Sequence, residues 1–241
     1  MIDIHSHILP GMDDGARSME QSLKMFRMAW QEGITSIITT PHNYGHRQSV
    51  APHKIREQVV KVQKELKNND ISIQIYPGNE IYYRQGVEEE LEKGNINTLA
   101  ESSYVLVEFH PGEDFHYILH GLNHLKCYGY SPILAHAERY DNLYLKKGRM
   151  EELKNSGVQL QINASSITAK GLMDIYKKRA FMLVKEQMAD YVATDAHSDG
   201  HRAPVILTCE KILQKKAGHE YTTKLLIENA EHILQQGKKI T

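Results

Sequence analysis

The sequence predicts an α/β protein folded as a distorted parallel (β/α)7 barrel. Short apolar runs rich in β-branched residues alternate with segments of helical periodicity, which favours a parallel sheet covered by helices. The chain has 241 residues, a length typical of a single α/β-barrel domain. No linker, low-complexity tract or internal repeat divides it. We therefore expect residues 1–241 to form one domain, with a doubly wound open sheet as the alternative architecture.

The candidate strands are apolar runs in which β-branched residues are frequent. They span residues 2–5, 34–40, 71–76, 104–109, 132–136, 158–162 and 190–194. Alternate side chains of a strand lie on opposite faces. The first run should therefore place Asp3, His5 and His7 on one face and Ile2 and Ile4 on the other.

The first helix has clear boundary signals. Ser18 with Gln21 three residues later forms a capping-box pattern, and Gly33 is a helix-ending residue. The helical spacing predicts a single buried stripe made of Met19, Leu23, Phe26 and Trp30.

The second helix begins at Pro52, a residue favoured in the first turn. Its spacing predicts a buried stripe of Ile55, Val59, Val62 and Leu66. Later helices are expected near residues 86–93, 116–128, 147–156, 171–188, 203–216 and 221–236.

Composition and charge restrict the class of function. Hydrophobic residues make up 41% of the chain, which is enough for a core, and the net charge of -1 gives no basic surface for nucleic acid. No apolar run reaches the roughly 20 residues of a membrane span, and the N-terminus lacks signal-peptide features. We expect a cytoplasmic enzyme without membrane insertion.

The two cysteines exclude one class of phosphatase. Neither Cys127 nor Cys209 is followed six residues later by arginine, because Ile133 and Lys215 occupy those positions. A thiolate phosphatase of the C-x5-R type is therefore excluded. The pair also forms no C-x-x-C motif and no evident disulfide framework.

Residue types that bind divalent metals follow six of the candidate strands. In a parallel barrel the carboxyl ends of the strands meet on one face, where active sites are built. Each of these residues taken alone could be a turn or cap residue. Structural roles of that kind do not explain why such residues recur at the same edge of the sheet. Their number suits two or three ions. The candidate ligands are His5, His7, Asp14, His42, Glu80, Glu108, His136, Asp195 and His197. The sixth strand offers only Asn163, a polar wall residue at most.

These motifs together resemble the PHP-domain (polymerase and histidinol phosphatase) superfamily. Within it, the chain closely resembles the bacterial manganese-dependent protein-tyrosine phosphatases that act on capsule and exopolysaccharide tyrosine kinases. The resemblance covers nearly the full length. It is carried by residues 2–10, 12–15, 40–42, 77–80, 108, 135–139 and 194–197, together with Arg202.

The resemblance implies a role for each ligand. His5, His7, Glu80 and Asp195 would hold one ion. Glu80 would bridge to a second ion, held also by Glu108 and His136. Asp14, His42 and His197 would hold a third. Arg139 and Arg202 match the phosphate-binding arginines of the family.

The chemistry expected from this set is hydrolysis of a phosphate monoester. Metal ions lower the pKa of a bound water and clamp phosphoryl oxygens, so no protein nucleophile is required and attack by metal-bound hydroxide is expected. Imidazole and carboxylate ligands suit manganese, iron or zinc, and the resemblance implies manganese. The resemblance also implies the partner, a phosphotyrosine protein that is a bacterial tyrosine kinase controlling polysaccharide synthesis.

Three other functions remain open on the sequence. A small-molecule phosphatase such as histidinol phosphatase shares the metal site. A nuclease is disfavoured by the neutral charge, and an inactive phosphotyrosine-binding regulator is disfavoured by the complete ligand set. Ala137, where many relatives have proline, and the loop 109–115 depart from the family pattern, which puts substrate preference in doubt.

Several further polar and aromatic residues have open roles. Asp3 is either a partner that orients an imidazole or an ordinary strand residue. His46 and His110 are candidates for the site mouth or for a general acid. Tyr44, Tyr82 and Tyr83 could stack on an aryl phosphate, although packing is the commoner role. The helical spacing of three more histidines favours a polar helix surface over a metal site: His116, His120 and His124.

Overall fold

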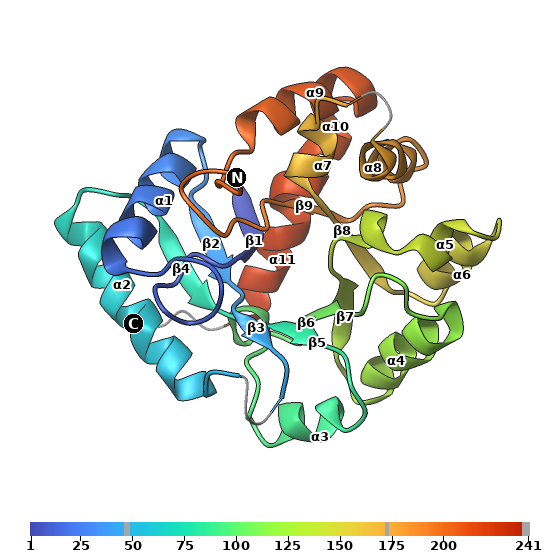
Figure 1. Ribbon diagram of the computed structural model, residues 1–241, viewed down its shortest axis with the longest axis horizontal. Helices are drawn as coiled ribbons and strands as arrows, with labels where there is room; N and C mark the ends of the chain where they lie inside the picture. Colours follow the sequence, from blue (N-terminus) through green and yellow to red (C-terminus); the bar gives the residue numbers. More distant parts are fainter. Residues whose placement is uncertain (46–48, 172–173, 238–241) are drawn as a thin grey trace.

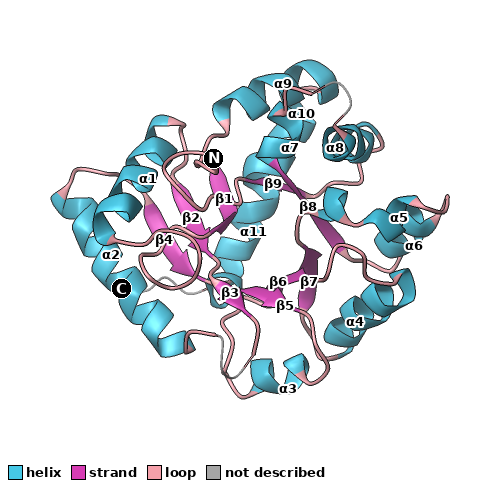
Figure 2. Ribbon diagram, viewed as in Figure 1, coloured by secondary structure: helices cyan, strands magenta, loops and turns pink. Residues whose placement is uncertain are grey.

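The structure is a computed structural model, which describes residues 1–45, 49–171 and 174–237. Its strands form a ring at the centre of the molecule and most of its helices lie outside this ring (Figure 1, Figure 2). The strands are β1 (Ile2–Ser6), β2 (Ser36–Thr39), β3 (His42–Asn43), β4 (Gln74–Pro77), β5 (Glu80–Tyr82), β6 (Tyr104–Glu108), β7 (Ser131–Leu134), β8 (Gln159–Asn163) and β9 (Tyr191–Ala193).

Helices follow most of the strands, as the alternation predicted. The α-helices are α1 (Met19–Gln31), α2 (Pro52–Asn68), α3 (Val87–Glu92), α4 (Phe115–Cys127), α5 (Asp141–Tyr144), α6 (Arg149–Asn155), α7 (Ala164–Thr168), α8 (Ile175–Lys185), α9 (Leu207–Ala217), α10 (His219–Thr223) and α11 (Asn229–Gln236). Shorter turns of other helical types are η1 (Leu99–Glu101), η2 (Ala137–Arg139) and η3 (Lys224–Glu228).

The strands close into a parallel barrel. One sheet has the order β1-β2-β4 and a second has the order β3-β5-β6-β7-β8-β9. A parallel bridge between Ser6 and Ala196 joins the two ends of the ring. The His7 amide donates to the Ala196 carbonyl (2.8 Å) and the Asp195 amide donates to the His5 carbonyl (2.9 Å) at the same seam. The predicted distorted parallel barrel is confirmed, and the open sheet is wrong.

A second, short strand that was not predicted follows each of two predicted strands after a break. The run at 34–40 gives β2, with β3 beyond it, and the run at 71–76 gives β4, with β5 beyond it. Pro41 lies at the first break, and it has no amide hydrogen to continue the ladder. Gly78 lies at the second, where an added Cβ would be 3.0 Å from the side chains of Ile38 and Leu99. The displaced segments β3 and β5 pair with each other, with His42 opposite Glu80.

Two apolar clusters hold the barrel. The outer cluster lies between the strands and the surrounding helices, and it contains all four predicted stripe residues of α2. An inner cluster fills the barrel and includes Ile4, Leu106 and Ile133, with Ala230 and Ile233 of α11 packed on it. Ile4 therefore faces the barrel interior rather than lying opposite the two histidines as predicted. The register between β1 and β2 is irregular between Asp3 and Ser6, which breaks simple alternation.

Other helix predictions are partly corrected. The Ser18 side chain caps α1 as predicted, by accepting from the Gln21 amide (3.2 Å). The predicted stripe of α1 is right for Phe26 and wrong for Trp30, which is 41% exposed, while Met19 and Leu23 are partly buried against the core. The other buried residues of α1 are Ser22, Met25 and Ala29. The Ser22 hydroxyl donates to a backbone carbonyl, which lets a polar residue occupy the buried face.

Helix boundaries at the C-terminal side also differ from the prediction. The segment 221–236 is interrupted by η3, a π-helical turn, and it is preceded by α10. The helix predicted at 171–188 begins only at Ile175, and residues 172–173 of that prediction lie outside the described residues. Within the described ranges no helix is both long enough and apolar enough to cross a membrane.

Candidate metal centre

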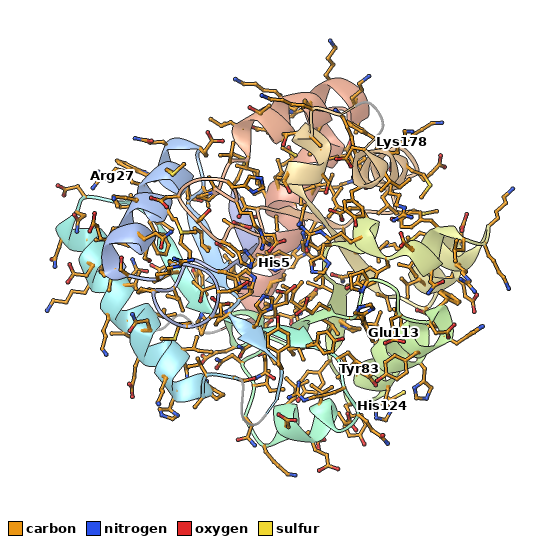
Figure 3. The ribbon with its side chains drawn as sticks, viewed as in Figure 1. His5, Arg27, Tyr83, Glu113, His124 and Lys178 are labelled. Carbon is orange, nitrogen blue, oxygen red and sulfur yellow. The ribbon has the colours of Figure 1, made fainter. Side chains whose placement is uncertain are left out.

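All nine predicted ligands lie at the carboxyl end of the barrel. They come from four strands, β1, β3, β5 and β6, and from the loops that follow β1, β7 and β9. Figure 3 shows His5 near the middle of the molecule, surrounded by the ring of strands. The structure therefore brings the nine side chains together, whereas their role as metal ligands stays a prediction.

Glu80 lies at the centre of the candidate metal centre. Its Oε2 atom is 3.2 Å from His5 Nε2, 3.2 Å from His7 Nε2 and 3.0 Å from His42 Nδ1. Its Oε1 atom is 3.0 Å from His136 Nε2. One carboxylate thus faces two sets of imidazoles with its two oxygens, which is the geometry of a bridging ligand.

Three groups of side chains have ligand atoms close enough to share an ion. The first contains His5, His7 and Glu80, and Asp195 Oδ1 lies 3.4 Å from His5 Nε2 beside it. The second contains His42, Glu80 and Glu108, with His136 Nε2 at 3.7 Å from Glu108 Oε2. The third contains His7, Asp14, His42 and His197.

The spacing of these atoms fits bound cations. Ligand atoms about 2.0–2.2 Å from one ion lie roughly 3.0–3.5 Å from each other. His42 Nδ1 and Glu108 Oε1 are 3.1 Å apart, yet neither atom has a hydrogen-bond partner among the described residues. His42 and His197 Nε2 atoms each lie 3.5 Å from Asp14 Oδ1. Atoms that converge on a point without hydrogen bonding one another indicate a place for an ion.

The imidazoles and carboxylates strongly perturb one another. Burial alone would lower the pKa of His7, but Asp13 and Glu80 outweigh it and raise this pKa to about 9. His136 behaves in the same way, with Glu108 and Glu80 raising its pKa to about 9 against burial. Burial favours a neutral carboxyl at Glu80, yet the surrounding imidazoles hold its pKa well below the usual range. Clusters of perturbed groups of this kind are typical of functional sites.

Two of the predicted ligands have an unusual backbone conformation. His136 has φ of 36° and Asp195 has φ of 51°, both in the left-handed region. These values are uncommon for residues other than glycine, and such strain concentrates at functional sites. They redirect the chain directly after β7 and near the end of β9, so that both side chains face the centre.

Some residues that support the ligands were missed by the sequence analysis. Asp13 Oδ2 lies 2.6 Å from His7 Nδ1 and accepts from the His42 amide (3.0 Å). Its position beside Asp14 was the available signal. Gln161 has no motif that marks it in the sequence, and Asn163 is predicted as a wall residue at most, yet both contact predicted ligands.

Asp3 has no imidazole ring as a hydrogen-bond partner among the described residues. Its carboxylate accepts from the Thr194 amide (3.0 Å) and from the Thr194 hydroxyl (2.5 Å), which ties β1 to β9. Of the two roles left open, that of an ordinary strand residue therefore fits the structure.

The two arginines meet on the outer edge of the centre. Arg202 Nη2 is 2.8 Å and Arg139 Nη2 is 3.3 Å from Asp195 Oδ2. Glu138, the acid next to Arg139 in the sequence, accepts from the Ser166 hydroxyl and the Asn163 amide. Separate pockets lie beside the two arginines, one lined in part by Arg139 and the other by Arg202.

The three candidate tyrosines differ in their position relative to the centre. Tyr44 is 43% exposed and stacks on His42 with ring centroids 5.0 Å apart, and Tyr82 lies 5.7 Å from Tyr44. Tyr83 is buried and stacks on Phe109, so it is a packing residue.

The other histidine candidates that the structure describes lie outside the centre. His116, His120 and His124 lie along α4, and no group of ligand atoms close enough to share an ion was found there among the described residues. His110 is exposed in the loop after β6 and accepts from the Gly112 amide. His46 lies outside the described residues.

The fold and the site define a class of protein: a parallel barrel with a cluster of imidazole and carboxylate side chains, candidate metal ligands, at its carboxyl end. The chain belongs to the CpsB/CapC family of capsular polysaccharide synthesis, whose model matches residues 1–235. This confirms the resemblance inferred from the sequence motifs.

Curated relatives match along almost their whole length. Tyrosine-protein phosphatase CpsB of Streptococcus agalactiae serotype III (strain NEM316) is 33% identical over 239 residues, covering 98% of each chain. Tyrosine-protein phosphatase YwqE of Bacillus subtilis (strain 168) is 34% identical, covering 98% of this chain and 92% of the relative.

Solved structures agree with the fold. A structure described with YwqE from Bacillus subtilis and CpsB from Streptococcus pneumoniae, as unique metal-dependent tyrosine phosphatases, superposes with a TM-score of 0.91 at 32% identity. It covers 100% of this chain and 96% of that one. The lactonase Lmo2620 from Listeria monocytogenes, at 12% identity and a TM-score of 0.57, shares the fold alone.

Proposed function

We propose that the protein is a metal-dependent protein-tyrosine phosphatase, a phosphomonoesterase that hydrolyses phosphotyrosine. The names of its full-length relatives support the activity. The observation that carries the proposal is the position of Asp195. Its Oδ1 atom faces His5 and His7, and its Oδ2 atom faces Arg139 and Arg202. A phosphate held by the arginines would therefore lie against the metal centre.

The nine side chains would hold two or three ions, and manganese is the first choice, with iron or zinc as alternatives. Mixed imidazole and oxygen ligands suit all three metals. Bound ions would supply a water of lowered pKa and would neutralise the phosphoryl charge, which supports the expected hydroxide mechanism. Glu80 would bridge, because its two oxygens face different imidazoles.

Arg139 and Arg202 would bind the phosphate. A guanidinium group donates two parallel hydrogen bonds to phosphate, whereas an ammonium group acts as a point charge. Both arginines now share one oxygen of Asp195, and both are partly exposed. An incoming phosphate would therefore compete with Asp195 for the two guanidinium groups, which already lie at the site.

The substrate would be a phosphotyrosine protein, and the family description supports a tyrosine kinase of capsular or exopolysaccharide synthesis. Tyr44 and Tyr82 form an exposed aromatic edge next to His42, which suits the ring of an aryl phosphate. This edge favours phosphotyrosine over histidinol phosphate, the second candidate substrate, in which the phosphate is carried by an alkyl group. The cytoplasmic location stays a prediction.

The test uses metal-free protein reconstituted separately with manganese, iron and zinc. Turnover of phosphotyrosyl peptides, histidinol phosphate and single-stranded DNA should be measured in parallel, together with the metal content. We expect metal-dependent turnover, fastest on the peptides. A parent protein that turns over only histidinol phosphate, or that degrades DNA, would overturn the assignment.

A Glu80→Gln variant checks the metal centre directly. It keeps the size of the side chain but removes a negative charge, so elemental analysis should find at least one ion fewer than in the parent. Unchanged metal content would remove Glu80 from the centre.

A further inference from the structure

A chain of two buried amides connects two neighbouring predicted ligands of the metal centre. Gln161 and Asn163 are alternate residues of β8, and both are fully buried. Gln161 Oε1 lies 3.0 Å from His5 Nδ1, and Gln161 Nε2 donates to Asn163 Oδ1 (2.8 Å). Asn163 Nδ2 then donates to Asp195 Oδ2 (2.8 Å). The chain therefore runs from His5 to Asp195.

The first end of the chain fixes how the Gln161 amide is oriented. The His136 backbone N–H donates to Gln161 Oε1 (2.9 Å). A backbone N–H can only donate, so the atom facing it must be the amide oxygen. The reversed orientation would place two donors against each other in a site without exposed surface. Gln161 Nε2 must then face Asn163.

The other end gives the same polarity independently. The carboxylate of Asp195 can only accept, and the same oxygen forms ion pairs with Arg139 and Arg202. The Asn163 atom that faces it must therefore be the NH2 group, which leaves Asn163 Oδ1 to face Gln161. A donor at one end and an acceptor at the other require one and the same orientation of both amides.

This polarity decides which nitrogen of His5 carries the proton. Gln161 Oε1 is an acceptor, so His5 Nδ1 must donate to it. The lone pair of His5 is then on Nε2, the atom 3.2 Å from Glu80 Oε2 and from His7 Nε2. His7 is oriented by a carboxylate, Asp13, whereas His5 depends on a neutral amide.

We propose that Gln161 and Asn163 are positioning residues that fix the tautomer of His5 and the orientation of Asp195 for metal binding. The proposal rests on the metal centre proposed above. Partners that hold the second nitrogen of a ligating histidine set ring orientation and ligand strength, and their loss weakens metal affinity about 10–100-fold. Asn163 extends the same control to Asp195, which also contacts the two phosphate-binding arginines.

Three variants test the proposal on the full chain. Gln161→Leu removes the acceptor and keeps a similar volume. Gln161→Glu keeps an acceptor oxygen for both His5 and the His136 amide. Gln159→Leu is the matched control, since Gln159 lies on the same face of β8 but accepts from the Tyr191 hydroxyl (2.6 Å) away from the centre. Manganese and zinc affinities should be measured by chelator competition, with thermal unfolding of each metal-free protein.

We expect Gln161→Leu to bind metal about 10–100-fold more weakly than the parent. Gln161→Glu should stay within about tenfold of the parent, and Gln159→Leu should match it. Parent-like affinity in Gln161→Leu would overturn the proposal. An equal loss of metal affinity in Gln161→Leu and Gln161→Glu would also overturn the proposal, because the affinity would then depend on the shape of the side chain and not on its acceptor oxygen.

Nitrogen NMR of the parent protein provides a test that does not depend on folding of a variant. In ¹⁵N-histidine-labelled protein loaded with diamagnetic zinc, His5 should carry its proton on Nδ1. Zinc bound through Nδ1, with the proton on Nε2, would overturn the proposal. A parent that binds no metal at all would instead contradict the metal centre itself, so the two failures are distinguishable.

Discussion

At the scale of single residues, a substitution at Arg139 should lower the catalytic rate without changing metal binding. Its guanidinium group contacts Asp195 Oδ2, and it has no lone pair to offer a metal. Arg139→Ala should therefore leave the metal content intact and lower kcat about 10²–10³-fold, as for loss of one oxyanion-hole donor. Arg139→Lys should restore only part of the rate, since it returns charge without the bidentate geometry.

Kinetics with phosphotyrosyl peptide and elemental analysis of the same samples check this prediction. Arg27→Ala is a suitable control, because Arg27 is exposed on α1, far from the centre (Figure 3). Near-normal turnover in a folded, fully metallated Arg139→Ala variant would remove Arg139 from the site. The residue would then be a rim ion pair worth about 0–1 kcal/mol of stability.

The raised pKa values of two histidines predict how metal binding depends on pH. In the metal-free protein the pKa of His7 and that of His136 are both raised to about 9, so both are protonated at pH 7. A metal must displace these protons, and affinity should rise about tenfold per pH unit for each imidazole until pH 9. Calorimetry in buffers of different ionisation enthalpy measures the protons released, and no release at pH 7.5 would contradict the prediction.

The same shifts predict the opposite trend for the stability of the metal-free protein. The folded-state pKa of His7, about 9, lies above the unfolded value of 6.5. Stability from this group is complete below pH 6.5 and is lost as the pH rises through 9. Adding metal should reverse the trend in this window, because deprotonated imidazoles then bind the ions.

At the scale of elements, the loop after β1 must approach β1 very closely. An added Cβ at Gly15 would lie 1.9 Å from the His7 carbonyl oxygen, which accepts from the Ala16 amide (3.0 Å). Gly15→Ala should push this loop away together with Asp13 and Asp14. We expect a loss of about 1–3 kcal/mol from overpacking and at least one ion fewer per chain.

Elemental analysis and thermal unfolding of this variant give the two readouts. Gly200→Ala is the matched control, because it lies in the loop near His197 and an added Cβ there meets nothing within 4 Å. Parent-like metal content in Gly15→Ala would show that the loop tolerates the displacement or that Asp14 holds no ion.

At the scale of the whole molecule, the centre gathers residues from nearly every part of the barrel. Glu80, Glu108 and Asp195 lie together there among five imidazoles, and bound cations would balance the charge of the three carboxylates. Metal binding should therefore stabilise the barrel as a unit. With free metal at about 100 times Kd the gain is about 2.7 kcal/mol, and chelation should lower Tm by roughly 5–10 °C.

Thermal unfolding with and without chelator measures this effect, with the metal restored in excess as the control. A Tm that does not respond to chelation would mean that the centre is formed equally well without ions. A response that is lost in Glu80→Gln would place the effect at the centre and not at adventitious surface sites.

The sequence by itself determined the order of strands and helices, the capping of α1 by Ser18, and the face on which the nine predicted ligands gather. These features are local. Hydrophobic period distinguishes strand from helix within a short window, and parallel strands place their carboxyl ends on one face whatever the packing. The arginines and the family also followed from motifs that are short and continuous, such as residues 135–139.

Only the tertiary structure decided how the barrel closes and how the ligands are held. The seam between Ser6 and Ala196, the breaks at Pro41 and Gly78, and the exposed side of Trp30 depend on which distant segments pack together. The pairing of Gln161 with His5 joins residues 156 positions apart. Hydrogen bonds of this kind have no sequence period, because their partners are chosen by the closed barrel and not by neighbouring residues.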